Sequence, residues 1–160
     1  MNQAHARWVI WFSLLIALVV YVLPLPFDWR WYRPEWPLLV LFYWALAVPH
    51  RVGIFSASLT GFSLDMIHGT AVGAMAIGCV VSMLVILLNY QRIRQFDSFL
   101  QALTVGLLVS LALLVELWLH NLMGLGSTGL ASMSSVPMSM LLWPVIRNGL
   151  RAIRRYYEVE

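Results

Sequence analysis

Asp65 is the residue whose type and surroundings most strongly indicate a functional site. It is the only formally charged residue between Arg51 and Arg92, in a stretch that is otherwise largely apolar. Residues four apart lie on one face of a helix, and a carboxyl group in lipid is costly enough to mark a candidate site. Small residues follow this four-residue spacing around it: Gly53, Ala57, Gly61, Gly69 and Gly73.

Two interpretations of Asp65 stay open at this point. An aspartate before a helix can accept backbone N–H bonds and cap that helix, in which case His68 and Gly69 form the turn between two helices. Alternatively, Asp65 makes a polar contact to a partner helix or a buried ligand, and the small residues let that partner approach closely. The interpretations are compatible, because a capped turn can also shape a docking surface.

Glu116 is the second acidic residue in an apolar segment, and His120 follows it by four residues. This spacing predicts a pair on one helix face; the alternative is a contact from Glu116 to another helix or a partner. Asp65 and His68 are a candidate acid–base pair for an intramembrane enzyme. No nucleophile motif, metal-ligand spacing or phosphate-binding glycine loop accompanies them. We therefore expect a protein that is not an enzyme and has no metal or cofactor.

The composition is that of an integral membrane protein. Of the 160 residues, 61% are hydrophobic and only 11% are charged, against roughly 25% charged in soluble domains. The polar stretches are too short to bury a core of their own, so residues 1–160 form one membrane domain. The arginines are dispersed at the ends of apolar segments, a pattern that favours membrane topology over nucleic-acid binding.

Six apolar segments are candidate membrane spans, each compared with the roughly 20 residues that a hydrocarbon core requires. The second and third are short and together form either two crossings or one re-entrant hairpin. His50 and Arg51 lie between them and favour two crossings, since a charged turn is costly at the bilayer centre. The predicted spans are Trp8–Phe27, Trp36–Val48, Val52–Met66, Thr70–Leu88, Phe99–His120 and Val136–Leu150.

The arginines predict the orientation of these spans. With the N-terminus inside, Arg30 and Arg33 are the only arginines outside, which agrees with the excess of positive charge in cytoplasmic segments and places both termini in the cytoplasm. Four arginines near the end of the last span are expected to bind lipid headgroups, with a specific cytoplasmic partner as the alternative; they are Arg147, Arg151, Arg154 and Arg155. The expected cytoplasmic arginines are Arg7, Arg51, Arg92, Arg94, Arg147, Arg151, Arg154 and Arg155.

The order of several short motifs resembles the bacterial rod shape-determining family MreD. These motifs are Arg7–Trp11, Arg33–Pro37, Phe42–Trp44, Pro49–Arg51, Gly61–Gly69 and Leu142–Pro144 with the basic tail. The resemblance implies a multi-pass protein of the bacterial inner membrane that binds the single-span protein MreC in the cell-elongation machinery. It also implies a six-helix fold similar to the substrate-binding subunits of energy-coupling-factor transporters.

The resemblance further implies the remaining partners. RodA and the elongation-specific penicillin-binding transpeptidase would be contacted directly or through MreC, and MreB and RodZ indirectly. We expect a non-enzymatic component that supports peptidoglycan synthesis and rod shape. Its expected partner-binding residues are Trp36, Pro49, Arg51, Gly61, Asp65, Gly69 and Gly73.

The alternative function is a small-molecule or lipid-binding membrane subunit like the vitamin-binding proteins of those transporters. In that case Asp65, Glu116 and the uncharged loop 121–137 would line an outward-facing pocket.

Overall fold

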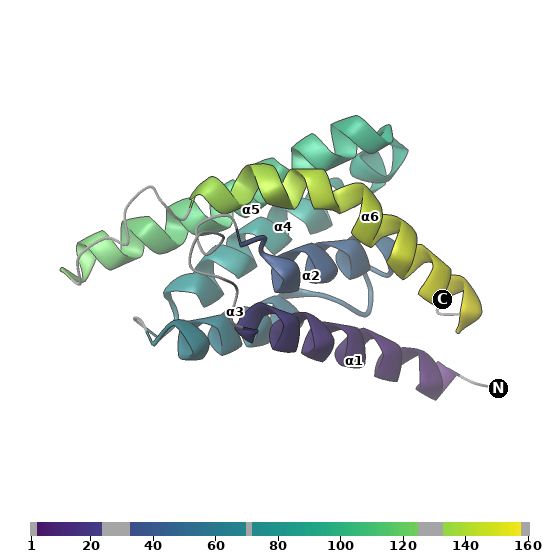
Figure 1. Cartoon of the computed structure of the whole chain (residues 1–160), viewed down its shortest axis with the longest axis horizontal. Helices are drawn as coiled ribbons and strands as arrows, with labels where there is room; N and C mark the ends of the chain where they lie inside the picture. Colours follow the sequence, from purple (N-terminus) through teal and green to yellow (C-terminus); the bar gives the residue numbers. More distant parts are fainter. Residues whose placement is uncertain (1–2, 24–32, 70–71, 125–132, 158–160) are drawn as a thin grey trace.

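The structure, a computed structural model, describes residues 3–23, 33–69, 72–124 and 133–157 (Figure 1). These residues form six helices and no strand, as expected for an all-helical protein. The helices are α1 (Gln3–Val22), α2 (Trp36–Ala47), α3 (Ile54–His68), α4 (Ala74–Gln95), α5 (Ser98–Leu122) and α6 (Ser135–Tyr156).

The central helix is α2, which contacts each of the other five helices. Every residue from Pro37 to Leu46 is buried, and the helix contains no charged residue. Pro37 is compatible with the first turn, where the backbone N–H has no partner within the helix. The helix ends just before Pro49, as expected because a proline disfavours helical geometry in the preceding residue. With 12 residues, α2 is about 18 Å long.

One hydrophobic cluster joins side chains from all six helices. Its two largest members are the buried indoles of Trp44 and Trp143. A buried indole N–H needs an acceptor, and both have one: Trp44 Nε1 donates to Ser13 Oγ at 2.8 Å, and Trp143 Nε1 donates to Gln101 Oε1 at 3.4 Å. The core is therefore packed without leaving these indole N–H groups unpaired.

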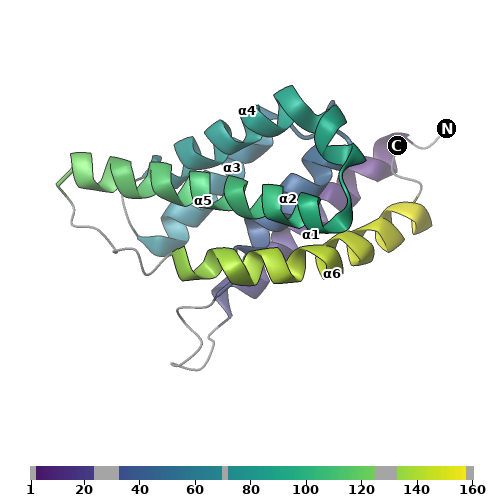
Figure 2. The ribbon, with the colours of Figure 1, turned by 90° about the horizontal axis from the view of Figure 1, so that it is seen from above.

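The first turn of α1 and the last turn of α6 lie at the same end of the helix bundle (Figures 1 and 2). The α2–α3 turn, the α4–α5 turn and the second half of α6 also lie there. We call this the arginine-rich end, because these segments contain most of the arginines. Arg33 lies at the opposite end, and Arg30 is outside the described residues. The segments of the arginine-rich end contain Arg7, Arg51, Arg92, Arg94, Arg147, Arg151, Arg154 and Arg155.

Two helices, α4 with 22 residues and α5 with 25, are long and apolar enough to cross a membrane. The apolar part of α1, Trp8–Val22, and helix α2 are shorter. All six predicted segments contain helix, while the prediction that each crosses the bilayer stays a prediction.

Some predicted boundaries differ from those of the helices. Helix α4 begins at Ala74 and continues to Gln95, and α6 continues past Leu150 to Tyr156. The extra turns are rich in arginine and glutamine, which are good helix formers, so the helix outlasts the apolar segment. Pro144 lies inside α6, which curves along its length (Figure 1). The predicted boundaries Phe27 and Thr70 lie outside the described residues.

Candidate functional site

The Asp65 carboxylate caps the start of α4. Its Oδ2 accepts N–H bonds from Gly73 at 2.9 Å and Ala76 at 3.2 Å, and its Oδ1 accepts one from Met75 at 2.9 Å. The residue is 0% exposed. The N–H groups of a first helical turn have no partner within the helix, so one carboxylate satisfies three donors there. The capping interpretation is confirmed.

Gly69 and Gly73 provide the backbone conformation of the α3–α4 turn. Their φ angles are +63° and +103°, in the left-handed region that glycine adopts without steric penalty. Nothing among the described residues lies within 4 Å of a Cβ built on either one. Within this chain they act through conformation rather than close packing, and they lie beyond the end of the small-residue face of α3. Their contact with a partner stays a prediction.

Gly61 has the opposite role, because it brings two helix backbones together. A Cβ at Gly61 would lie 2.4 Å from Ala76 Cα in α4. A Cβ at Gly78, on α4, would lie 2.4 Å from the Ala112 carbonyl oxygen in α5. Small residues permit this close packing between membrane helices. Helix α4 is therefore held tightly between α3 and α5, and its first turn is held by Asp65.

A cluster of polar side chains lies beside this turn, at the end opposite the arginine-rich end. The Tyr21 hydroxyl of α1 is 2.7 Å from His68 Nε2 of α3. On the other side of the ring, His68 Nδ1 is 3.8 Å from Glu116 Oε1 of α5. The expected pairing of Glu116 with His120 is replaced by this contact across helices. His120 is 3% exposed, and its Nε2 has no hydrogen-bond partner among the described residues.

Glu35 joins the cluster from just outside α2. Its backbone N–H donates to Ser139 Oγ of α6 at 3.1 Å, and the residue is 6% exposed. Burial, reinforced by the charge of Glu116, raises the pKa of this carboxyl to about 8, although Arg33 and Tyr21 act in the opposite direction. Its Oε2 has no hydrogen-bond partner among the described residues. The raised pKa therefore favours the protonated, neutral form of Glu35 at pH 7.

This protonation makes the fold sensitive to pH. The folded carboxyl keeps its proton to about pH 8, whereas the unfolded one releases it near 4.5. Between these values the folded state binds more protons, so stability falls as pH rises, by at most about 1.4 kcal/mol per pH unit. Glu35→Gln, which is neutral at every pH, should flatten this dependence in thermal unfolding of the detergent-solubilised protein between pH 5 and pH 9. Equal slopes for the two proteins would contradict a protonated Glu35.

The other predicted partner-binding residues are spread along the molecule. Trp36 opens α2 beside the polar cluster and packs against the hydrophobic core. Pro49 and Arg51 form the α2–α3 turn at the arginine-rich end, where Arg51 Nη1 is buried with no hydrogen-bond partner among the described residues. The predicted set therefore occupies both ends of the bundle and does not form one surface.

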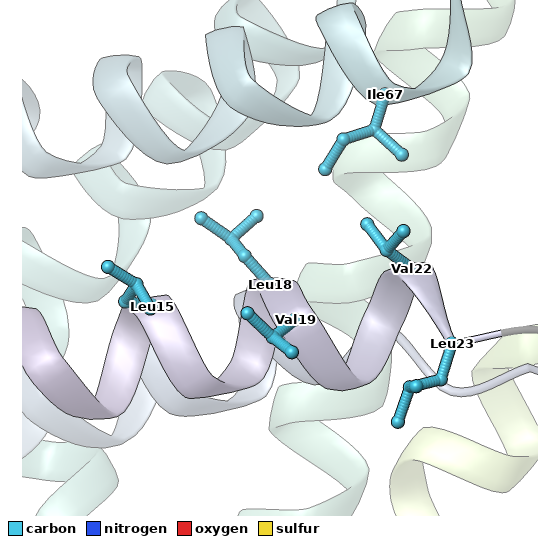
Figure 3. A pocket seen from close by; sticks show the side chains of 6 residues that line it. All are labelled: Leu15, Leu18, Val19, Val22, Leu23 and Ile67. Carbon is cyan, nitrogen blue, oxygen red and sulfur yellow. The ribbon is translucent and has the colours of Figure 1, made fainter.

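An apolar groove of about 370 Å³ lies between α1 and α3 (Figure 3). Leu18 and Val22 of α1 point across it toward Ile67 of α3. Ile67 is two residues after Asp65, so the cap that fixes the end of α3 also fixes this wall of the groove. The side chains that line it are all aliphatic: Leu15, Leu18, Val19, Val22, Leu23 and Ile67.

Within the described residues, no group of three or more His, Cys, Asp or Glu side chains is placed to hold a metal ion. Asp65 and His68 are close in the chain, but the Asp65 carboxylate accepts three hydrogen bonds from backbone N–H groups. The Asp65 carboxylate therefore positions the first turn of α4.

Sequence reasoning missed Gly78, Glu35 and Tyr21. A signal for Gly78 was present, since Ala74, Gly78 and Ser82 are small residues at steps of four, and all three are buried in α4. No pattern in the sequence marks Glu35 or Tyr21, whose roles depend on which helices meet in space.

Comparison with known proteins identifies the family. Residues 2–153 match the sequence model of the family described as rod shape-determining protein MreD. The chain is also 35% identical over 153 residues to the rod shape-determining protein MreD of Haemophilus influenzae, which covers 91% of this chain and 92% of that protein. No solved structure matches the chain. Since the family match spans nearly all of its length, the chain belongs to the MreD family of rod shape-determining proteins.

Proposed function

We propose that this chain is a non-enzymatic, multi-pass component of the bacterial inner membrane that binds MreC through membrane helices and supports peptidoglycan synthesis and rod shape. Family membership supports the role in cell shape. RodA and the elongation-specific transpeptidase are reached directly or through MreC, and MreB and RodZ indirectly.

The distribution of charge supports a topology with six crossings and both termini in the cytoplasm. The arginine-rich end collects eight arginines, whereas Arg33 lies at the other end. Positive residues favour the cytoplasmic side of a membrane, so this end faces the cytoplasm and the polar cluster faces outward. Helices α2 and α3 are short, but α2 is shielded from lipid by its neighbours and does not need to match the bilayer thickness alone.

The groove between α1 and α3 is the observation that carries the partner proposal. Association between membrane helices depends on packing rather than on a hydrophobic driving force, so a concave apolar surface gives a partner helix more contact than a flat one. Val22 is 55% exposed beside it. The single membrane helix of MreC is the occupant that we assign to this groove. Asp65, Gly61 and Gly69 then act on binding indirectly, by fixing the position of α3.

Filling the groove tests this assignment. We expect Val22→Trp to reduce co-purification with MreC by roughly tenfold, the change that corresponds to about 1.4 kcal/mol, and to produce rounded cells. Leu107→Trp is the matched control, because Leu107 is an exposed apolar residue of α5 that does not line the groove.

Thermal unfolding of both variants checks that neither disturbs the fold. If Val22→Trp and Leu107→Trp retain MreC equally, the groove is not the docking site. If the unaltered protein does not capture MreC at all, the partner proposal itself is wrong.

The second candidate function is a small-molecule or lipid-binding subunit with a pocket at the outer end. Two buried, unpartnered atoms favour it, Glu35 Oε2 and His120 Nε2, since buried polar atoms in native proteins normally have a partner. Part of the loop 121–137 that would cover such a pocket lies outside the described residues. Native mass spectrometry of the purified protein distinguishes the candidates, because a stoichiometric small ligand supports the second and MreC alone supports the first.

A further inference from the structure

A small polar pocket lies at the arginine-rich end, between α2, α4, α5 and α6. Its volume is about 200 Å³. It shares no lining residue with the apolar groove and lies at the opposite end from the polar cluster. The polar side chains that line it are Tyr43, Arg94, Gln101, Arg147, Arg151 and Arg154.

The charged side chains that line this pocket, among the described residues, are all arginines. No acidic side chain among the described residues lines it. The charges of Arg147 and Arg151 act unfavourably on each other, and the Tyr43 hydroxyl lies within the field of both. The guanidinium groups of Arg94, Arg147 and Arg151 around one small pocket therefore favour an anion, whose charge would offset their repulsion.

Hydrogen-bond donors remain available inside the pocket. Arg147 Nη1 donates to Ser98 Oγ at 3.0 Å, which leaves other N–H groups of a guanidinium that has five. Arg94 and Arg151 make no hydrogen bond to the described residues. Gln101, by contrast, is held by Ile93 and Trp143 at its two amide ends and forms a fixed wall. Guanidinium groups match phosphate oxygens in geometry as well as charge.

The position and size of the pocket narrow the ligand to a phosphoryl group. Small-molecule sites for drug-sized ligands are usually roughly 300–1,000 Å³, so this pocket is small for a nucleotide. Basic pockets between membrane helices on the cytoplasmic side are suited to lipid headgroups. We propose that this pocket binds the phosphoryl group of an anionic phospholipid, a chemistry that inorganic phosphate shares.

The arginines that line the pocket differ from the four that the sequence predicted to bind lipid headgroups. Arg155 was expected to act with Arg147, Arg151 and Arg154, but it does not line the pocket. Arg94, which is on α4, does. Binding at a discrete site therefore depends on the arginines that line it, whereas general attraction to a charged surface would depend on every arginine at this end.

Two charge-matched double variants distinguish a discrete site from general attraction to a charged surface. Arg147→Gln with Arg151→Gln removes two lining arginines, and Arg92→Gln with Arg155→Gln removes two arginines of the same end that do not line the pocket. We expect the first to reduce retention of phosphatidylglycerol, over phosphatidylcholine, by about tenfold in native mass spectrometry of protein released from nanodiscs. The second should stay within about twofold of the unaltered protein. Tyr43→Phe, which preserves the packing, should give an intermediate loss.

A parallel titration with inorganic phosphate identifies the source of the ligand. Phosphate-induced stabilisation that is lost only in the Arg147/Arg151 variant supports the site and assigns free phosphate as its ligand, whereas selective lipid retention assigns the headgroup. Equal losses of lipid retention in the two double variants would show that binding depends on diffuse surface charge, and would contradict a binding site in the pocket. No loss in either would do the same.

Discussion

Gly61→Ala and Gly78→Ala are expected to lower the stability of the protein strongly, although each adds only one methyl group. The new Cβ would lie 2.4 Å from Ala76 Cα in the first case and 2.4 Å from the Ala112 carbonyl oxygen in the second. These neighbours are backbone atoms, so relief requires movement of a whole helix. Overpacking of this kind typically costs about 1–3 kcal/mol, and we expect values at or above the top of that range in thermal unfolding of the detergent-solubilised protein.

Two further glycines provide graded controls for the same substitution. A Cβ at Gly106 would meet the Met140 side chain, which is flexible and can move aside, so Gly106→Ala should be milder. A Cβ at Gly149 meets nothing within 4 Å among the described residues, and alanine there should raise stability by up to about 1 kcal/mol through helix propensity. An unchanged unfolding midpoint for Gly61→Ala would show that α3 and α4 are not packed as closely as described.

Asp65→Ala is expected to have the second large effect. It removes the acceptor for three backbone N–H groups, those of Gly73, Met75 and Ala76, and the bond from Met75 is buried. Loss of an N-cap alone costs about 1 kcal/mol, and donors left unsatisfied in a buried site cost more, so we expect a loss of about 3 kcal/mol or more. Asp65→Asn should be intermediate, because its amide NH₂ replaces one acceptor oxygen with a donor. The measurement is the unfolding midpoint in detergent.

Asp97→Asn is the matched control for this change. Asp97 also precedes a helix, α5, but it is exposed and makes no capping bond from its side chain. Its substitution should alter stability by less than about 0.5 kcal/mol. Equal effects of Asp65→Asn and Asp97→Asn would remove the special role assigned to Asp65.

These stability effects also bear on how loss of MreC binding should be interpreted. An Asp65 or Gly69 variant that loses its partner will also have a perturbed α3–α4 turn. Val22→Trp should lose the partner without loss of stability, because Val22 is exposed. Comparing the two kinds of variant separates a contact residue from a residue that holds the contact surface in place.

Local features of the sequence predicted much of the α3–α4 turn. An isolated aspartate followed by glycines is sufficient to predict a capped turn, because the cap and the left-handed glycine positions depend on residues close in the chain. The helices themselves followed from the apolar segments. The ends of the helices could not be predicted in this way, because hydropathy measures compatibility with lipid and the helical turns of α4 beyond Leu88 are polar.

Contacts between distant helices were not predictable in the same way. Glu116 was expected to pair with His120 four residues later, but it lies against His68. Arg94 and Arg147 meet at one pocket although they are on different helices. Such contacts depend on how each helix is rotated and crossed against its neighbours, which composition and spacing in one sequence do not determine.

The central position of α2 imposes an order on how the protein is made. The ribosome completes α2 second, yet four of its five neighbours, α3, α4, α5 and α6, are synthesised later. During that interval α2 must remain beside α1 with much of its surface facing lipid, which its uncharged, largely aliphatic and aromatic sequence allows. Burial of α2 is complete only when α6 arrives, so a chain halted before Ser135 leaves one side of its most hydrophobic helix uncovered.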